Sequence, residues 1–179
     1  MSAHVIAVAR DATHRFSKTI VPEIRLLQGL GVEGDAHCGE TVKHRSRVCA
    51  DPTQPNLRQV HLYQSELFDE YAVKGFAVSP GDLGENIAPK GIDLLELPRG
   101  TLLCIGPNAQ VEITGLRNPC SQIDDFLPGL LSAALFQAED HIVRRTGVMG
   151  VVQSGGVVRP GDGMEVHLPQ KPHKALERV

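Results

Sequence analysis

Turns recur so often along this chain that only short regular elements fit between them. Its 179 residues include 18 Gly and 12 Pro, which supply the positive φ and the fixed φ that tight turns require. The apolar runs between these turns are short and rich in Val, Ile and Leu, a pattern typical of strands. We therefore predict a mainly β fold, a barrel of short strands decorated by two or three helices.

Strand-like runs fill most of the chain. We expect strands over residues 4–9, 17–27, 59–63, 94–95, 101–105 and 109–114, another after the turn at 80–86, and a hairpin with a closing strand over 150–168. Helical periodicity predicts helices over residues 65–74, capped by Ser65, and over residues 130–145. The remaining segments are predicted to be a glycine-shaped loop over 29–39, an irregular loop over 40–57 and a frayed polar tail over 169–179.

Length, charge and cysteine usage restrict the class of protein. The length and the lack of a boundary signal predict a single domain over residues 1–179. A formal net charge of −3 argues against a general nucleic-acid binder. We see neither a signal peptide nor a membrane-spanning apolar run. The four cysteines form no CxxC pair, so we expect free thiols in a reducing cytoplasm.

The segment Thr114–Asp124 is the strongest candidate for chemistry. It follows the alternating apolar run Val111–Ile113, so we expect it at the end of a strand. Pro119 stiffens the backbone before Cys120. Arg117, three residues before the cysteine, would favour the thiolate, which is the form that binds metal or attacks. The competing interpretation is a small, buried, inert cysteine.

Polar residues in two loops are further candidates. The 40–57 loop contains the basic cluster Lys43, His44, Arg45 and Arg47. We interpret this loop as one that carries positive charge over a cleft; a solvated loop without a ligand is the alternative. Asp35 and Glu85 also have two interpretations, because acidic residues in glycine turns often bond only the local backbone.

Four motifs, taken in order, resemble those of MOSC domains, which are related to the C-terminal part of molybdenum cofactor sulfurases. The motifs are Gly34–His37, Pro80–Ile87, Leu116–Ile123 and the glycine-rich runs within Gly150–Asp162. The resemblance covers about residues 5–168 and is strongest to small stand-alone bacterial members of the YiiM type. It implies a closed β-barrel like the pyruvate kinase β-barrel domain, with residues 169–179 as a tail.

The resemblance also implies a cofactor. In this family the motif cysteine, here Cys120, lies in a pocket associated with the molybdenum–pterin cofactor (Moco), and in some members its thiolate ligates the metal. A thiolate suits molybdenum, while the cofactor's phosphate requires cations and N–H donors. The predicted cations are Arg117, Lys43, His44, Arg45 and Arg47. Asp35, Glu85 and Asn86 are predicted to bond the pterin edge or orient loops, and His37 also to relay a proton.

Three functions are consistent with these residues. The leading hypothesis is reduction of N-hydroxylated compounds, an activity of enzymatic family members, with Cys120 as metal ligand and electrons from a separate reductase. The second is a sulfur carrier, in which a cysteine desulfurase loads Cys120 with a persulfide for metal–sulfur cluster or cofactor assembly. The third is a non-catalytic ligand-binding module, and a homodimer is one allowed assembly. A zinc site of His37, Cys38, His44 and Cys49 is also considered, although its spacing fits no common zinc pattern.

Overall fold

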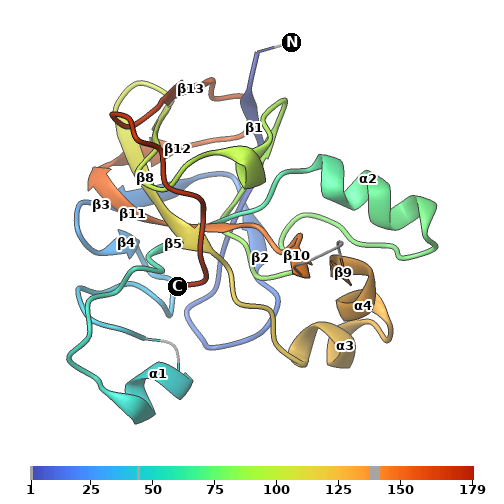
Figure 1. The fold of residues 1–179 in the computed structure, drawn as a ribbon. Coiled ribbons are helices and arrows are strands. Elements are labelled where there is room, and N and C mark those ends of the chain that lie inside the picture. Colours follow the sequence, from blue (N-terminus) through green and yellow to red (C-terminus); the bar gives the residue numbers. More distant parts are fainter. Residues whose placement is uncertain (1, 44, 138–141) are drawn as a thin grey trace.

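The computed structural model describes residues 2–43, 45–137 and 142–179, and its fold is mainly β (Figure 1). The main sheet joins eight strands in the order β13 (Met164–His167), β7 (Leu102–Ile105), β8 (Ala109–Leu116), β11 (Val148–Ser154), β5 (Val60–Leu62), β6 (Ile87–Lys90), β1 (His4–Arg10) and β2 (Thr19–Val21). A second sheet joins β12 (Gly156–Val158), β3 (Ile24–Leu27) and β4 (Gly31–Val32), and β9 (Leu135–Gln137) pairs with β10 (Ile142–Arg144).

Backbone hydrogen bonds join β1, the last strand but one of the main sheet, to the residues around β13 at the opposite end. The Val5 N–H donates to Asp162 O at 2.8 Å, and the Met164 N–H donates to Ala3 O at 2.9 Å. The start of β1 is thereby joined to the residues that lead into β13, which completes a barrel and protects edges that would otherwise be unpaired. The predicted mainly β barrel is confirmed.

The core consists of apolar side chains that point into the barrel. Along β8, Val111 and Ile113 are fully buried while Glu112 between them is half-buried, as the alternation of a strand requires. A second cluster lies under helix α2 (Glu66–Val73), where the ring of Tyr63 stacks on that of Phe68 with centroids 5.2 Å apart. Full burial of such side chains contributes roughly 1.5–3 kcal/mol each.

The described residues contain four short helices, where the sequence predicts two or three: α1 (Arg45–Ala50), α2, α3 (Gln122–Phe126) and α4 (Leu130–Ala134). The helix predicted over residues 65–74 is confirmed as α2, and Gly75 follows it at φ +86°. Ser65 precedes α2 without making a side-chain capping bond. Helix α1 lies inside the 40–57 segment, for which the sequence predicts no regular structure.

The helix predicted over residues 130–145 is wrong. Helix α4 is only five residues long, and the hairpin β9–β10 follows it. Residues 138–141 of the predicted helix lie outside the described residues. The hairpin positions the C=O of Arg145 to accept hydrogen bonds from the hydroxyls of Tyr63 and Tyr71, at 2.8 and 2.7 Å. Because these tertiary bonds need an extended chain, they override the local helical pattern.

Three smaller predictions also differ from the structure. Leu94 and Leu95, predicted as a strand, belong to a 3-10 helix (Leu94–Glu96) because the Asp93 carboxylate accepts from the Leu95 N–H at 3.1 Å. Strands β11 and β12 do not form a hairpin with each other, since β11 pairs with β5 and β8 while β12 pairs with β3. The tail does not fray at its end, where a bridge joins Arg178 to Leu116.

A helix must be long and apolar to span a membrane. None of the described helices is long and apolar enough to cross a bilayer.

Candidate functional site

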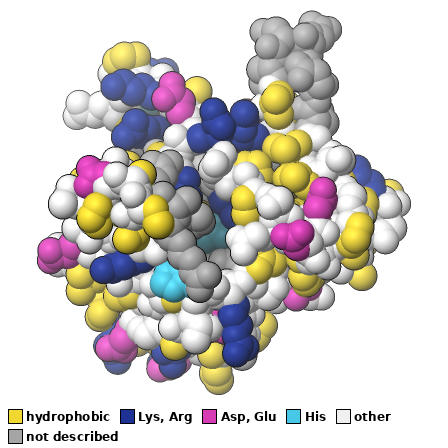
Figure 2. Space-filling model, turned by 90° about the horizontal axis from the view of Figure 1, so that it is seen from below, with side chains coloured by type: hydrophobic (Ala, Val, Ile, Leu, Met, Phe, Trp, Pro, Cys, Tyr) yellow, Lys and Arg dark blue, Asp and Glu magenta, His cyan; other side chains and the backbone are white. Residues whose placement is uncertain are grey.

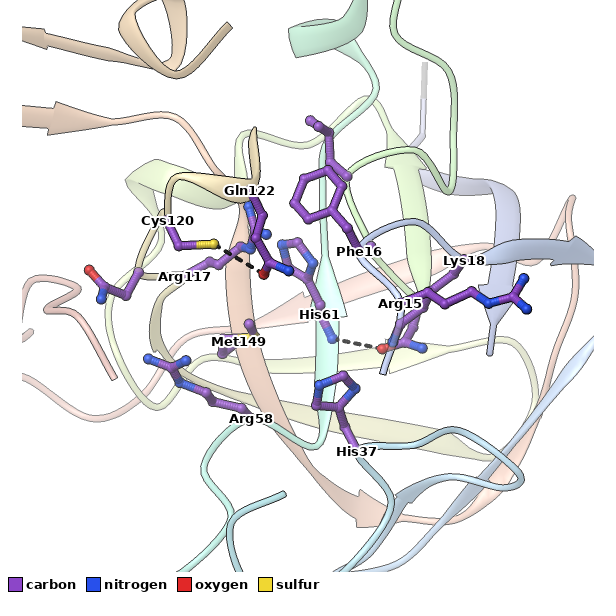
Figure 3. A pocket seen from close by; sticks show the side chains of 14 residues that line it. Arg15, Phe16, Lys18, His37, Arg58, His61, Arg117, Cys120, Gln122 and Met149 are labelled. Carbon is purple, nitrogen blue, oxygen red and sulfur yellow. Dashed lines mark hydrogen bonds between the residues drawn. The ribbon is translucent and has the colours of Figure 1, made fainter. Parts of the chain in front are cut away.

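A cavity of about 90 Å³ lies at one end of the barrel, and we call it the Cys120 pocket. Its lining residues are Arg15, Phe16, Lys18, His37, Arg58, His61, Leu83, Gly84, Asn86, Arg117, Asn118, Cys120, Gln122 and Met149. Figure 2 shows the hollow from below, with dark blue basic side chains beside it and a histidine inside. Figure 3 shows Cys120 and Arg117 on one side of the pocket, and Arg15 and Lys18 on the other.

The loop after β8 presents Cys120. Strand β8 ends at Leu116, and the Arg117 N–H donates to Gly147 O at 3.1 Å, which attaches the start of the loop to the barrel. Four residues after the strand, the thiol of Cys120 is half-buried and donates to Gln122 Oε1 at 3.4 Å. The sulfur is therefore held at the pocket rather than sealed in the core. The residue is placed where a ligand can reach it.

Arg117 supplies a cation beside the thiol. Its guanidinium carbon lies 5.7 Å from the ring centre of Phe16. Its Nη1 is shielded from solvent and has no hydrogen-bond partner among the described residues. Burial lowers the pKa of Arg117, and negative charge at Cys120 opposes that shift. A shielded donor without an acceptor is costly, so the pocket favours an anion at this nitrogen.

Asp35 organises the opposite wall without lining the cavity. Its carboxylate accepts from Lys18 Nζ at 2.7 Å, from Asn86 Nδ2 at 3.0 Å, and from the backbone N–H and Nδ1 of His37 at 2.9 and 3.1 Å. Burial alone raises the pKa of Asp35, but the bonds from His37 and the charge of Lys18 outweigh it and hold that pKa far below its usual range. Asp35 therefore orients the three residues that do line the pocket.

Glu85 supports the same wall from behind. The side chain is buried, is absent from the pocket lining, and accepts from the backbone N–H of Gly81 through Oε1. Gly81 has φ +90°, and a Cβ there would lie 2.6 Å from the backbone oxygen of Lys18. The turn thus packs closely on the Lys18 segment. Burial raises the pKa of Glu85 to about 6.

The basic cluster of the 40–57 segment has one described member near the site. Lys43 lines a second hollow, of about 150 Å³, which shares His37 and Arg58 with the Cys120 pocket. His44 lies outside the described residues. Arg45 begins helix α1, whose first turn also contains Arg47; the structure describes the backbone there and not these side chains. Their role as cofactor ligands stays a prediction.

Several lining residues were not predicted from the sequence, among them Arg15, Phe16, Lys18, Arg58, His61, Gln122 and Met149. His61 is buried, and its Nε2 is 3.0 Å from Thr146 O. Burial lowers the pKa of His61 well below its usual range, and the charge of Arg117 adds to this, so the imidazole is neutral. The sequence gives one signal for these residues: His61 lies in the strand predicted over residues 59–63, and Arg58 directly precedes it.

The other cysteines do not line the Cys120 pocket. Cys38, Cys49 and Cys104 are free thiols, and burial raises the pKa of Cys38. Within the described part of the chain, no group of three or more His, Cys, Asp or Glu side chains is arranged to hold a metal ion.

Comparisons with known proteins show which family and fold this chain resembles. A sequence model of the MOSC domain matches residues 35–165. YuaD of Bacillus subtilis (strain 168), whose name places it provisionally in metal-sulfur cluster biosynthesis, is 31% identical over 163 residues, or 83% of each chain. The crystal structure of YuaD superimposes with a TM-score of 0.75 at 25% identity, over 95% of this chain and 98% of that one.

A more distant structure has the same fold. YiiM from Geobacillus stearothermophilus superimposes with a TM-score of 0.64 at 19% identity, over 97% of this chain and 79% of that one. MOSC domains are associated with the molybdenum cofactor and with sulfur-related roles. The domain match and the similarity to YuaD show that this chain belongs to the MOSC domain family.

Proposed function

We propose that this protein binds the molybdenum–pterin cofactor at the Cys120 pocket and uses it to reduce N-hydroxylated compounds. The observation that carries the proposal is the shielded Nη1 of Arg117, which has no partner among the described residues and lies in the same pocket as a half-buried thiol. An anionic group would satisfy Arg117, and a soft metal would suit Cys120. The cofactor carries both.

The size of the pocket decides how much of the cofactor it takes. Pockets for complete small-molecule ligands measure roughly 300–1,000 Å³, and the Cys120 pocket measures about 90 Å³. We therefore infer that the Cys120 pocket would hold only the metal end or one anionic group, and that residues of the adjoining hollow would hold the remainder. Lys43 and Arg58 line that hollow and supply positive charge.

Each wall has a separate task in the proposed reaction. When bound, the cofactor supplies two electrons for cleavage of the N–O bond, which also consumes two protons and releases water. Cys120 would hold the metal end, and Arg117 would neutralise negative charge beside it. His37, oriented by the Asp35 carboxylate at 3.1 Å, moves a proton to the leaving oxygen. A separate reductase supplies the electrons.

Molybdenum content tests this proposal. The protein is expressed in cells that make the cofactor, and molybdenum per chain is measured by mass spectrometry on freshly purified wild type, Cys120→Ser and Cys104→Ser. Cys104 lies on β7 outside the pocket, so its variant is the matched control. We expect stoichiometric metal in wild type and the control and a large loss in Cys120→Ser. Wild-type protein without molybdenum would overturn the proposal.

A sulfur carrier is the second candidate. It is favoured by the partial exposure of Cys120, whose thiol donates to a side-chain oxygen of Gln122, and by the name of YuaD. A cysteine desulfurase would transfer a sulfane sulfur to the Cys120 thiolate and leave with its own thiolate. Incubation with desulfurase and cysteine would then add the mass of one sulfur atom to the Cys120 peptide, without metal. An unchanged peptide mass would exclude this function.

A further inference from the structure

The end of the described chain lies across the root of the Cys120 loop. Residues 176–179 run parallel to the last residue of β8, where the Leu116 N–H donates to Glu177 O at 2.8 Å and the Val179 N–H donates to Leu116 O at 3.3 Å. Figure 1 shows this dark red segment descending across the front of the barrel. It is therefore attached to the residue immediately before Arg117.

A glycine makes this approach possible. A Cβ at position 115 would lie 2.7 Å from Val179 Cγ1 and closer still to Glu177 O. Gly115 lies within β8 and has no positive φ, so its backbone does not require glycine. Close approach of residues 177–179 is what excludes a side chain there.

The same segment connects two walls of the site. The Val179 C=O accepts from the Arg58 guanidinium, and Arg178 Nη1 lies 3.5 Å from Asn118 Oδ1. Both Arg58 and Asn118 line the Cys120 pocket. Val179 also forms part of the wall of the adjoining hollow, and Glu177 and Arg178 line another depression on their other side. The segment thus contacts two residues that line the Cys120 pocket, and it lines two neighbouring hollows itself.

We propose that residues 176–179 form a displaceable strap that narrows the Cys120 pocket when docked and widens it when released. The purpose of the strap rests on the proposed function, since the docked pocket of about 90 Å³ is too small for the whole cofactor. Only Leu176 of this segment packs against the core, and Glu177 and Arg178 are exposed. The segment is held mainly by hydrogen bonds rather than by core packing, so its release is a local opening that leaves the barrel core in place.

The test compares two glycine variants in the full chain. Gly115→Ala forces the strap away, whereas Gly163→Ala is the matched control because a Cβ there meets nothing within 4 Å. Hydrogen exchange of the Leu116 amide reports docking directly. With two backbone bonds lost, we expect exchange at Leu116 to rise about tenfold or more in Gly115→Ala and to stay at the wild-type rate in Gly163→Ala.

Thiol labelling then reports the size of the opening. Cys120 is labelled with a small and with a bulky maleimide-type reagent, and peptide mass spectrometry separates it from the other cysteines. Strap release predicts a larger rate increase for the bulky reagent than for the small one. Equal increases for both reagents, or none for either, would overturn the proposal.

A second variant covers a folding failure of Gly115→Ala. Arg178→Ala removes only an exposed contact to Asn118, and we expect it to raise bulky-reagent labelling about twofold. The matched control is Arg25→Ala, another exposed arginine, which lies away from the pocket lining. Labelling that is the same in Arg178→Ala and Arg25→Ala would count against the strap. These readouts need no metal, so their failure is distinguishable from failure of the molybdenum proposal.

Discussion

The two walls of the Cys120 pocket differ in how completely the charged side chains of Asp35 and Arg117 are paired. On one wall, both oxygens of the Asp35 carboxylate are used, by Lys18, His37 and Asn86. On the other, Arg117 has a shielded nitrogen without an acceptor among the described residues, and the Cys120 thiol is half-buried. The paired wall is a frame, while the unpaired wall is where a ligand can gain binding energy.

We infer from this difference that residues on one wall stabilise the fold and residues on the other bind a ligand. Removing a partner from the paired wall strands a buried charge, so the whole fold is affected. Removing Arg117 or Cys120 from the unpaired wall strands no buried charge, so we expect the fold to lose no stability while ligand binding is lost.

The largest expected effect is loss of stability in Asp35→Ala. Lys18 is 5% exposed, and without Asp35 its charge is buried and unpaired. We expect the free energy of unfolding to fall by about 3–5 kcal/mol, measured by urea denaturation. Asp69→Ala, on an exposed position of α2, is the control and should change stability by less than about 0.5 kcal/mol. Equal losses of unfolding free energy in both variants would contradict a structural role for Asp35.

A smaller effect is expected from the pH dependence of Glu85. Its pKa is about 6 in the folded state against 4.5 for the free side chain, so the folded state binds more protons between these values. Stability due to this group is therefore present below about pH 4.5 and lost as pH rises through 6, by about 2 kcal/mol. Asp35 acts in the opposite sense, because its lowered pKa gives stability above 3.8 that is lost in acid.

The variant Glu85→Gln isolates the contribution of Glu85 ionisation to stability. The amide oxygen still accepts from the Gly81 N–H, but the side chain no longer ionises. Denaturation measured from pH 4 to 8 should show a flatter profile in the variant and a gain of about 2 kcal/mol at neutral pH. Parallel profiles for wild type and Glu85→Gln would show that Glu85 titrates normally.

The smallest stability effect is expected on the unpaired wall. Arg117→Met loses the contact with Phe16 but removes an unsatisfied shielded donor, so unfolding free energy should stay level or rise by up to about 2 kcal/mol. Binding should respond differently, with molybdenum content falling at least about tenfold because the anion loses its partner. Arg117→Lys keeps the charge and should retain part of the metal. Full loading of Arg117→Met would contradict the ligand role.

Local patterns in the sequence were enough for the strands. Residues 109–114 alternate apolar and polar side chains and form β8, because one face of a barrel strand is always inside. Local patterns were not enough where contacts with distant residues decide the secondary structure. The C=O of Arg145, for example, accepts hydrogen bonds from two tyrosines more than seventy residues earlier in the chain. The motif around Cys120 predicted the thiol at a pocket, and the structure lines the pocket with it.

The rest of the site could not be read from sequence spacing. Lys18 forms its ion pair with Asp35 because the turn after Ser79 holds the Lys18 backbone in place. The Lys18 N–H donates to Gly81 O at 2.8 Å. Arg58 lies two residues before β5 and lines the pocket, but its neighbours in the sequence do not distinguish it from a surface arginine. Such contacts join separate segments of the chain, so they appear only when the barrel is assembled.

X-ray absorption at the molybdenum edge decides whether Cys120 is a metal ligand, because it counts the sulfur atoms bound to the metal. Wild type, Cys104→Ser and Cys120→Ser are compared after loading with the cofactor. Counted on the molybdenum that stays bound, we expect one sulfur neighbour fewer in Cys120→Ser than in the other two, with unfolding free energy changed by less than about 1 kcal/mol. The same sulfur count in all three proteins would contradict it.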